Sequence, residues 1–264
     1  MSGKDIRLGR LLGNDSNAAI VAVDHGAEFG PIPGVIDLRA ALDNLMGADA
    51  ILVNPTMLDK CGDFFAQPGA PLAIARLTWT TSYCFPWNYQ EAHTAQVCSA
   101  AKAMEMGADL VMACCTLLTG DEALDAENVS LFAAIAEEAH DAGLPFIGEF
   151  YPLNAENLPQ DELHDQVYRI VRILAELGAD AVKTFYTGPK FNEIAASAAV
   201  PVFVLGASKR TELAALEMAN EAVQAGARGV AFGRNVFQAD DPARFCNALV
   251  KVVHKEATPE QAMA

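Results

Sequence analysis

LGADAVKT, residues 177–184, decides the fold of this chain, because the same pattern occurs four times. Its counterparts are MGADAILV (46–53), MGADLVMA (106–113) and AGARGVAF (225–232). Each copy combines the end of a helix, a glycine and a short apolar strand. Because glycine can adopt the left-handed conformation that closes a helix, we expect one helix-to-strand turn used four times.

Apolar runs of strand length extend this pattern over the whole chain. The candidate strands are Ala19–Val23, Ala50–Val53, Leu72–Leu77, Leu110–Cys114, Pro145–Glu149, Ala181–Phe185, Pro201–Leu205 and Gly229–Gly233. Apolar residues at helical spacing lie between most of them, as in Glu91–Met106, Ala126–Ala142, Glu162–Leu177 and Arg210–Ala225. This alternation predicts a parallel sheet covered by helices.

Eight such units favour a closed (β/α)8 TIM barrel in the α/β class. The alternative is an open, doubly wound sheet. No strand is followed by a GxGxxG or Walker-type phosphate loop, which disfavours that alternative. We expect residues 1–264 to form a single domain with a frayed tail at 255–264.

Composition excludes several classes of function. The formal net charge of −16 opposes binding to nucleic acid or to an anionic membrane. No apolar run is long enough to span a bilayer and no leader is visible, so we expect a soluble cytoplasmic protein. The cysteines form no CxxC pair or zinc spacing, so we expect free thiols and no metal site.

The active site of such a barrel lies at the carboxyl ends of its strands. Lys183 is the most informative polar residue there, because it lies inside an apolar run, Ala181–Phe185. Burial disfavours the ammonium form, and the free amine can attack a carbonyl. The alternative is a structural lysine paired with a carboxylate at the barrel mouth.

Other polar residues at the strand ends are candidates for acid–base chemistry. Asp24 closes the first apolar run, and Tyr151 follows the fifth, where its phenol could donate a proton to a substrate oxygen. Glu149 is a further acid–base candidate, and His25 and Arg76 are candidate substrate contacts. A capping role for Asp24 and simple hydrogen-bonding roles for Tyr151 and His25 are the alternatives.

Two late segments resemble an anion site. Gly206, Ser208 and Lys209 follow the seventh candidate strand, and Gly233 and Arg234 end or follow the eighth. Phosphate pockets of barrels commonly lie there, where backbone N–H groups and a cation supply positive charge. Plain turns are the alternative.

These residues, in this order, resemble the DhnA-type class I aldolases of the DeoC/LacD group, which include archaeal fructose-bisphosphate aldolase and an autoinducer thiolase. The resemblance rests on VAVDHGAEFGPIPG from Val21, GADAVKTFYTG from Gly178 and GVAFGRNVFQ from Gly229. It implies a Schiff base on Lys183, proton transfer by Asp24 and Tyr151, and phosphate contacts from Gly206, Gly233 and Arg234. It also implies a ring-shaped homo-oligomer, with a decamer as the candidate assembly.

Two departures from the family pattern bear on the substrate. The family usually has GG before the lysine of the seventh loop, where this chain has Gly206-Ala207-Ser208-Lys209. It also usually has YPRG after the fifth strand, where this chain has Tyr151-Pro152-Leu153-Asn154. The missing arginine argues against a second anionic group on the substrate, and Glu149 would oppose one.

The resulting hypothesis is a class I aldolase (lyase) of carbohydrate metabolism that acts on a phosphorylated ketose, with a dihydroxyacetone-phosphate-like donor. Its chemistry would use a Schiff base on Lys183 and no cofactor. One alternative is acyl transfer from a phosphorylated diketone to coenzyme A. Another is a non-catalytic barrel that binds a sugar phosphate.

Overall fold

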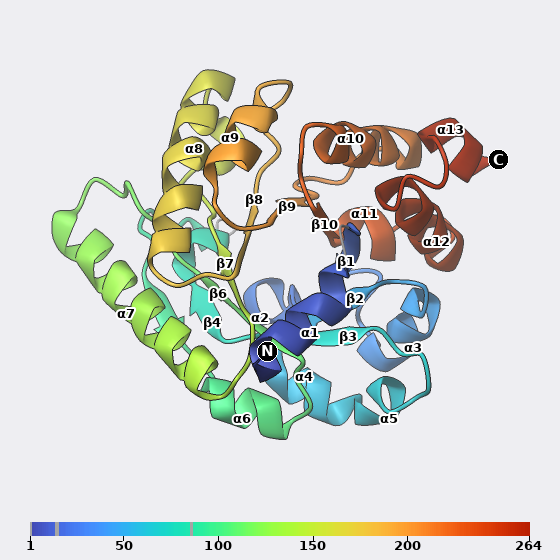
Figure 1. Ribbon diagram of the computed structural model, residues 1–264, viewed down its shortest axis with the longest axis horizontal. Helices are drawn as coiled ribbons and strands as arrows, with labels where there is room; N and C mark the ends of the chain where they lie inside the picture. The colour runs from blue at the N-terminus through green and yellow to red at the C-terminus, as the bar shows by residue number, and fades with distance from the viewer. Residues whose placement is uncertain (1, 14–15, 85–86) are drawn as a thin grey trace.

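The computed structural model describes residues 2–13, 16–84 and 87–264. Eight parallel strands close into a barrel in the order β1-β10-β9-β8-β7-β6-β3-β2, which confirms the predicted (β/α)8 fold (Figure 1). The barrel strands are β1 (Ala18–Ala22), β2 (Ala50–Val53), β3 (Leu72–Arg76), β6 (Leu110–Cys114), β7 (Phe146–Glu149), β8 (Ala181–Thr184), β9 (Val202–Leu205) and β10 (Gly229–Phe232).

Helices surround the barrel and cover the outward faces of its strands (Figure 1). They are α1 (Gly3–Leu12), α2 (Gly26–Phe29), α3 (Leu38–Leu42), η1 (Asp43–Leu45), α4 (Pro55–Lys60), α5 (Gly62–Phe65), η2 (Thr81–Tyr83), α6 (Ala100–Glu105), α7 (Glu122–Asp141), η4 (Ala155–Asn157), α8 (Gln160–Glu176), α9 (Phe191–Ser197), α10 (Glu212–Gln224), α11 (Arg234–Phe237), α12 (Pro242–Val253) and α13 (Pro259–Met263). Side-chain caps begin three of the longer ones: Asp121 precedes α7, Thr211 precedes α10 and Asp241 precedes α12.

The aspartate of the repeated GAD motif ties neighbouring strands together. Asp49 accepts a hydrogen bond from the backbone N–H of Ala19 at 2.7 Å, which joins the start of β2 to β1. Asp109 does the same for Ala73 at 3.0 Å, and Asp180 for Phe146 at 2.9 Å. In these three copies the aspartate therefore fixes the start of its strand against the preceding strand of the barrel.

The glycines of the repeat follow the prediction at three of four places. Gly107, Gly178 and Gly226 have φ of 101°, 107° and 98°, in the left-handed region. Gly47 does not have a positive φ. A Cβ there would lie 2.2 Å from Asn247 Oδ1, so a larger residue would displace the Asn247 side chain of α12.

Helix α1 closes the amino end of the barrel. Its Leu11 and Leu12 pack with residues of the barrel interior, including Ile20 and Ile74. Arg10 pairs with Asp109, directly before β6, and Figure 1 shows α1 crossing in front of the strands. With this end filled, the carboxyl end is the open one.

Two predictions from the sequence were wrong. The expected helix Glu91–Met106 is helical only in α6, because residues 94–96 form β5 (Thr94–Gln96), which pairs antiparallel with β4 (Thr78–Thr80). The tail 255–264, which we expected to be frayed, contains α13, whose capping box joins Thr258 and Gln261 and whose Pro259 is buried.

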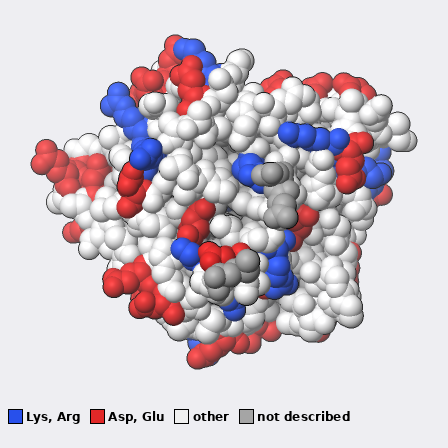
Figure 2. Space-filling model, viewed as in Figure 1, with Lys and Arg blue, Asp and Glu red and all other residues white. Residues whose placement is uncertain are grey.

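Groups of acidic side chains lie on the surface of the protein (Figure 2). Figure 2 shows them grouped over α6 and the outer ends of α7 and α8, with basic side chains between them. Within the described residues, no helix is both long and apolar enough to cross a membrane.

Candidate active site

Side chains alternate along the barrel strands between the interior and the helices. At the carboxyl ends of several strands, this alternation turns one charged residue toward the interior. On β8, Ala181 belongs to the barrel interior and Val182 packs toward the helices, so Lys183 points inward again. By the same alternation Arg76 follows Ile74 on β3 and Glu149 follows Ile147 on β7. These three side chains therefore meet above the apolar interior, at the carboxyl end of the barrel.

The segment after β1 supplies three more polar groups to this place. Asp24 lies two residues beyond β1 and is 3% exposed. His25 precedes the short helix α2, which turns Glu28 into the pocket, where Glu28 is also 3% exposed. Glu28 was not among the residues predicted from the sequence, although it lies within the quoted segment VAVDHGAEFGPIPG.

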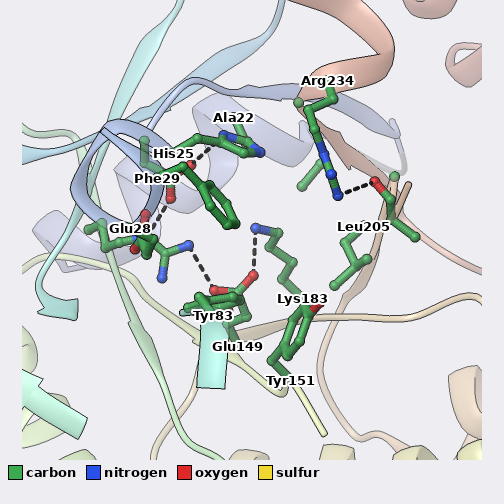
Figure 3. A pocket seen from close by; sticks show the side chains of 16 residues that line it. Ala22, His25, Glu28, Phe29, Tyr83, Glu149, Tyr151, Lys183, Leu205 and Arg234 are labelled. Carbon is green, nitrogen blue, oxygen red and sulfur yellow. Dashed lines mark hydrogen bonds and ion pairs between the residues drawn. The ribbon is translucent and has the colours of Figure 1, made fainter. Parts of the chain in front are cut away.

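An ion-pair network connects these groups (Figure 3). Lys183 Nζ lies 2.5 Å from Glu149 Oε1, and Glu149 Oε2 accepts a hydrogen bond from Arg76 Nη2 at 2.9 Å. On its other side Arg76 Nε donates to Asp24 Oδ2. Arg76 Nε lies 4.0 Å from Glu28 Oε1, which makes no hydrogen bond to any described residue.

This network differs from the apolar surroundings that the run Ala181–Phe185 predicts for Lys183. Lys183 is 6% exposed and paired with a carboxylate, as in the structural alternative. A buried pair still supports covalent chemistry, because the carboxylate is placed to accept the proton that the amine must lose.

The arginine and lysine keep two carboxyls ionised. Burial by itself raises the pKa of Asp24, but Arg76 and Lys183 outweigh it and lower this pKa to about 2. Burial also acts to raise the pKa of Glu149, and the positive charges of Lys183 and Arg76 hold it below its ordinary value. Both groups are therefore bases at neutral pH.

Two other groups are shifted toward their uncharged forms. Burial raises the pKa of Glu28 to about 7, and the carboxylates of Asp24 and Glu149 add to the rise while Arg76 opposes it. Burial lowers the pKa of His25 to about 4, although Asp24 acts in the other direction. His25 is therefore neutral at pH 7, and Glu28 can carry a proton that it donates to a ligand.

The ends of β9 and β10 form a second, positive side of the pocket. Arg234 Nη2 donates to the carbonyl of Ala207 at 3.1 Å, and Arg234 Nε is buried without a hydrogen-bond partner among the described residues. A Cβ on Gly233 would lie 2.4 Å from His25 Cε1, so this position requires glycine. Asn235 donates to the carbonyl of Gly206 at 2.9 Å and fixes the turn.

The structure separates the predicted anion-site residues. Gly206, Gly233 and Arg234 line the pocket, whereas Ser208 and Lys209 are not among its lining residues. The ammonium of Lys209 instead donates to the carbonyl of Gln238 at the surface.

Aromatic rings form one wall. The Tyr151 ring lies 4.5 Å from that of Tyr83 and 5.0 Å from that of Phe185. The Arg76 guanidinium lies over the Tyr83 ring at 5.2 Å. Tyr83 and Phe29 line the pocket and were missed from the sequence, because neither lies at a predicted strand end.

These side chains enclose a pocket with an empty volume of about 620 Å³, which is open to solvent. It brings together Asp24, His25, Arg76, Glu149, Tyr151, Lys183, Gly206, Gly233 and Arg234 from the predicted set. Among the described residues, no group of three or more His, Cys, Asp or Glu side chains is arranged to hold a metal ion. The pocket offers one buried amine, adjacent bases and a cation for an anionic ligand.

Comparisons with known proteins agree with this arrangement. Residues 18–239 match the family described as DeoC/LacD family aldolase. The chain is 31% identical over 272 residues to an uncharacterized aldolase of Saccharolobus solfataricus, covering 100% of this chain and 98% of the relative. It is 30% identical over 269 residues to 2-amino-3,7-dideoxy-D-threo-hept-6-ulosonate synthase of Halobacterium salinarum, covering 100% and 96%.

A solved structure of the Schiff base-forming fructose-1,6-bisphosphate aldolase superposes with a TM-score of 0.80 at 28% identity. The superposition covers 94% of this chain and 98% of the other.

Proposed function

The chain belongs to the DeoC/LacD family of aldolases, and we propose that it is a class I aldolase with Lys183 as its Schiff-base residue. The observation that carries the proposal is the 2.5 Å contact between Lys183 Nζ and Glu149 Oε1 inside the pocket. It joins the inward-facing amine of the barrel to a base. The Schiff base-forming aldolase of similar structure supports the same chemistry.

The first step forms the Schiff base. Glu149 accepts a proton from the Lys183 ammonium, and the free amine attacks the keto carbon of the substrate. The carbonyl oxygen takes up a proton to give a carbinolamine, and this oxygen then leaves as water to give an iminium. We assign the delivery of these protons to Tyr151, which lines the same pocket.

The second step breaks the carbon–carbon bond. The hydroxyl on the far carbon loses its proton to a base and becomes the aldehyde, while the electron pair of the broken bond moves to the iminium nitrogen and leaves an enamine. Asp24 is kept as an ionised base by Arg76, and we assign it to this proton transfer. Protonation of the enamine carbon and addition of water release the ketone donor and regenerate Lys183.

The positive side of the pocket favours a phosphorylated donor. Gly206 and Gly233 let a ligand approach the backbone, and Arg234 brings a cation whose Nε is unpaired among the described residues. A phosphate held there would fix the keto carbon over Lys183. We therefore propose a dihydroxyacetone-phosphate-like donor.

Borohydride reduction tests the assignment. Dihydroxyacetone phosphate, incubated with the protein and reduced, should give one stable adduct on the peptide that contains Lys183, located by mass spectrometry. Lys183→Ala should give none, whereas Lys190→Ala, which removes an exposed lysine beside α9, should trap as the natural protein does. An undiminished adduct in Lys183→Ala would refute the assignment.

A second incubation separates the acyl-transfer alternative. A phosphorylated diketone supplied with coenzyme A should yield no acyl-CoA if the reaction is an aldol cleavage. We also propose that the protein acts in the cytoplasm as a homo-oligomer, which sedimentation analysis can measure.

A further inference from the structure

The two sides of the pocket differ in charge. This difference bears on the second substrate of an aldolase, the aldehyde acceptor. The ends of β9 and β10 hold Gly206 and Arg234, on one side of Lys183 in the barrel order. The ends of β7 and β3 and the segment after β1 hold Glu149, Arg76 and Glu28. Figure 3 shows Arg234 on one side of Lys183, with Glu28 and Glu149 on the other.

On the side of the pocket that holds Glu149, Arg76 and Glu28, carboxylates already balance the positive charge, and only Arg76 Nη1 has no hydrogen-bond partner among the described residues. Arg76 is the one guanidinium of this side among the pocket-lining residues, and it already binds Asp24 and Glu149 and lies 4.0 Å from Glu28. Lys183 balances a second carboxylate only while it is an ammonium. When the donor is present as a neutral enamine on Lys183, that balance is lost, and an aldehyde acceptor approaches three carboxyl groups and one arginine.

Glu28 adds a hydrogen-bonding group to this side. Its Oε1 is buried in the pocket and makes no hydrogen bond to a described residue. A buried carboxyl oxygen without a partner is unfavourable until a ligand provides one. The hydroxyl of a bound aldehyde can provide it, whereas a phosphate or carboxylate would add negative charge beside the ionised Asp24 and Glu149.

A second cavity adjoins the first at Tyr151. It has an empty volume of about 510 Å³. Its lining residues are Ser82, Tyr89, Tyr151, Leu153, Asn154, Ala155 and Asn157. They present hydroxyl, amide and apolar groups, and none of these described residues carries a positive charge, so the cavity suits a neutral polyol chain.

We propose that the acceptor of this aldolase is an uncharged hydroxylated aldehyde, so that its ketose carries a phosphate at the donor end only. The inference rests on the proposed function and adds the class of the second substrate.

Paired acceptors test the proposal. With dihydroxyacetone phosphate as donor, kcat/KM is measured for glyceraldehyde against glyceraldehyde 3-phosphate and for erythrose against erythrose 4-phosphate. We expect the unphosphorylated member of each pair to be favoured by about 10-fold or more. Equal values, or a preference for the phosphorylated members, would overturn the proposal.

A charge-insertion variant makes the test independent of intrinsic aldehyde reactivity. Asn157→Lys places a cation in the second cavity and should shift the ratio of the two kcat/KM values toward the phosphorylated acceptor by about 10-fold. Gln224→Lys adds the same charge at the exposed end of α10 and should leave the ratio unchanged. A ratio that stays the same in Asn157→Lys would place the acceptor elsewhere and contradict the proposal.

Failure of this inference is distinguishable from failure of the proposed function. Borohydride trapping of the donor on Lys183 requires no acceptor. Trapping together with a preference for phosphorylated acceptors rejects only the acceptor class, whereas loss of trapping at Lys183 rejects the function itself.

Discussion

Lys183 and Glu149 are partners in the sheet as well as in the ion pair, because they face each other in the register of β8 and β7. The strand pairing holds the two side chains on the same inward face, and Nζ and Oε1 meet at 2.5 Å. The base is therefore positioned by backbone hydrogen bonds on a rigid element, before any substrate binds.

The variant Glu149→Gln should retain the shape of the site and lose most of the activity. We expect kcat to fall by about 10² to 10⁴, because the carboxylate no longer accepts the lysine proton, with a smaller change in KM. Initial rates over a range of donor concentrations provide the measurement.

Glu105→Gln is the matched control for this change. Glu105 is 65% exposed and pairs with Lys102 on the surface, so the control should keep the natural rate. If Glu149→Gln is as active as this control, Glu149 has no part in proton transfer.

Substitution of Gly233 tests the positive side of the pocket, which the ends of β9 and β10 form. In Gly233→Ala the new methyl group would lie 2.4 Å from His25 Cε1 and 2.9 Å from the carbonyl oxygen of Ala22. Such overpacking should cost about 1–3 kcal/mol of unfolding free energy and raise KM for the donor, because the turn below the phosphate must shift. Urea unfolding and steady-state kinetics measure the two effects.

Gly62→Ala is the comparison for that variant. A Cβ at Gly62 meets nothing within 4 Å, so the change should be nearly neutral for both stability and KM. Equal behaviour of the two alanine variants would show that the turn after β10 has room that the structure does not indicate.

The periodicity of apolar residues was sufficient to predict the barrel and the charged residues near the carboxyl ends of its strands. Lys183, Arg76 and Glu149 each continue an inward-facing series along a strand, so a period of two places them in one pocket. Glu28 could not be found in this way, because it lies on a helix of one turn after β1 rather than on a strand.

The errors have local physical causes. Residues 91–99 contain no glycine or proline that would stop a helix, yet β5 pairs with β4, and this tertiary pairing outweighs local preference. Lys209 follows β9 as predicted, but its long side chain reaches Gln238 at the surface instead of the pocket. Sequence position fixed the loop in which Lys209 lies and left the direction of the side chain undetermined.

Arg234 and Lys209 therefore make a discriminating pair. Arg234→Met should lower kcat/KM for dihydroxyacetone phosphate by about 10- to 100-fold, because a charged hydrogen bond to phosphate is lost. It should have little effect on unphosphorylated dihydroxyacetone. Steady-state kinetics with the two donors provide the comparison.

Lys209→Met removes a neighbouring charge that lies outside the pocket and should change neither value. The reverse result, with a large loss of kcat/KM in Lys209→Met and none in Arg234→Met, would contradict the assignment of phosphate binding to Arg234.

The pH dependence of stability should show two opposing contributions from adjacent residues. Glu28 has its pKa raised by burial from 4.5 to about 7, so the folded protein binds its proton more tightly than the unfolded chain. Its stabilising contribution is complete below pH 4.5 and is lost as pH rises through 7. His25 has its pKa lowered by burial from 6.5 to about 4, so its contribution is present above pH 6.5 and is lost as pH falls through 4.

Between pH 4.5 and pH 6.5 the two contributions have opposite slopes, and each shift corresponds to roughly 3 kcal/mol over its whole range. Relative to the natural protein, Glu28→Gln should lose unfolding free energy on acidification from pH 6.5 to pH 4.5, because the His25 contribution is then unopposed. His25→Asn should gain it over the same interval. Urea unfolding at pH 4.5, 5.5 and 6.5 measures the slopes, and slopes of the same sign relative to the natural protein would show that burial does not shift these two groups in opposite directions.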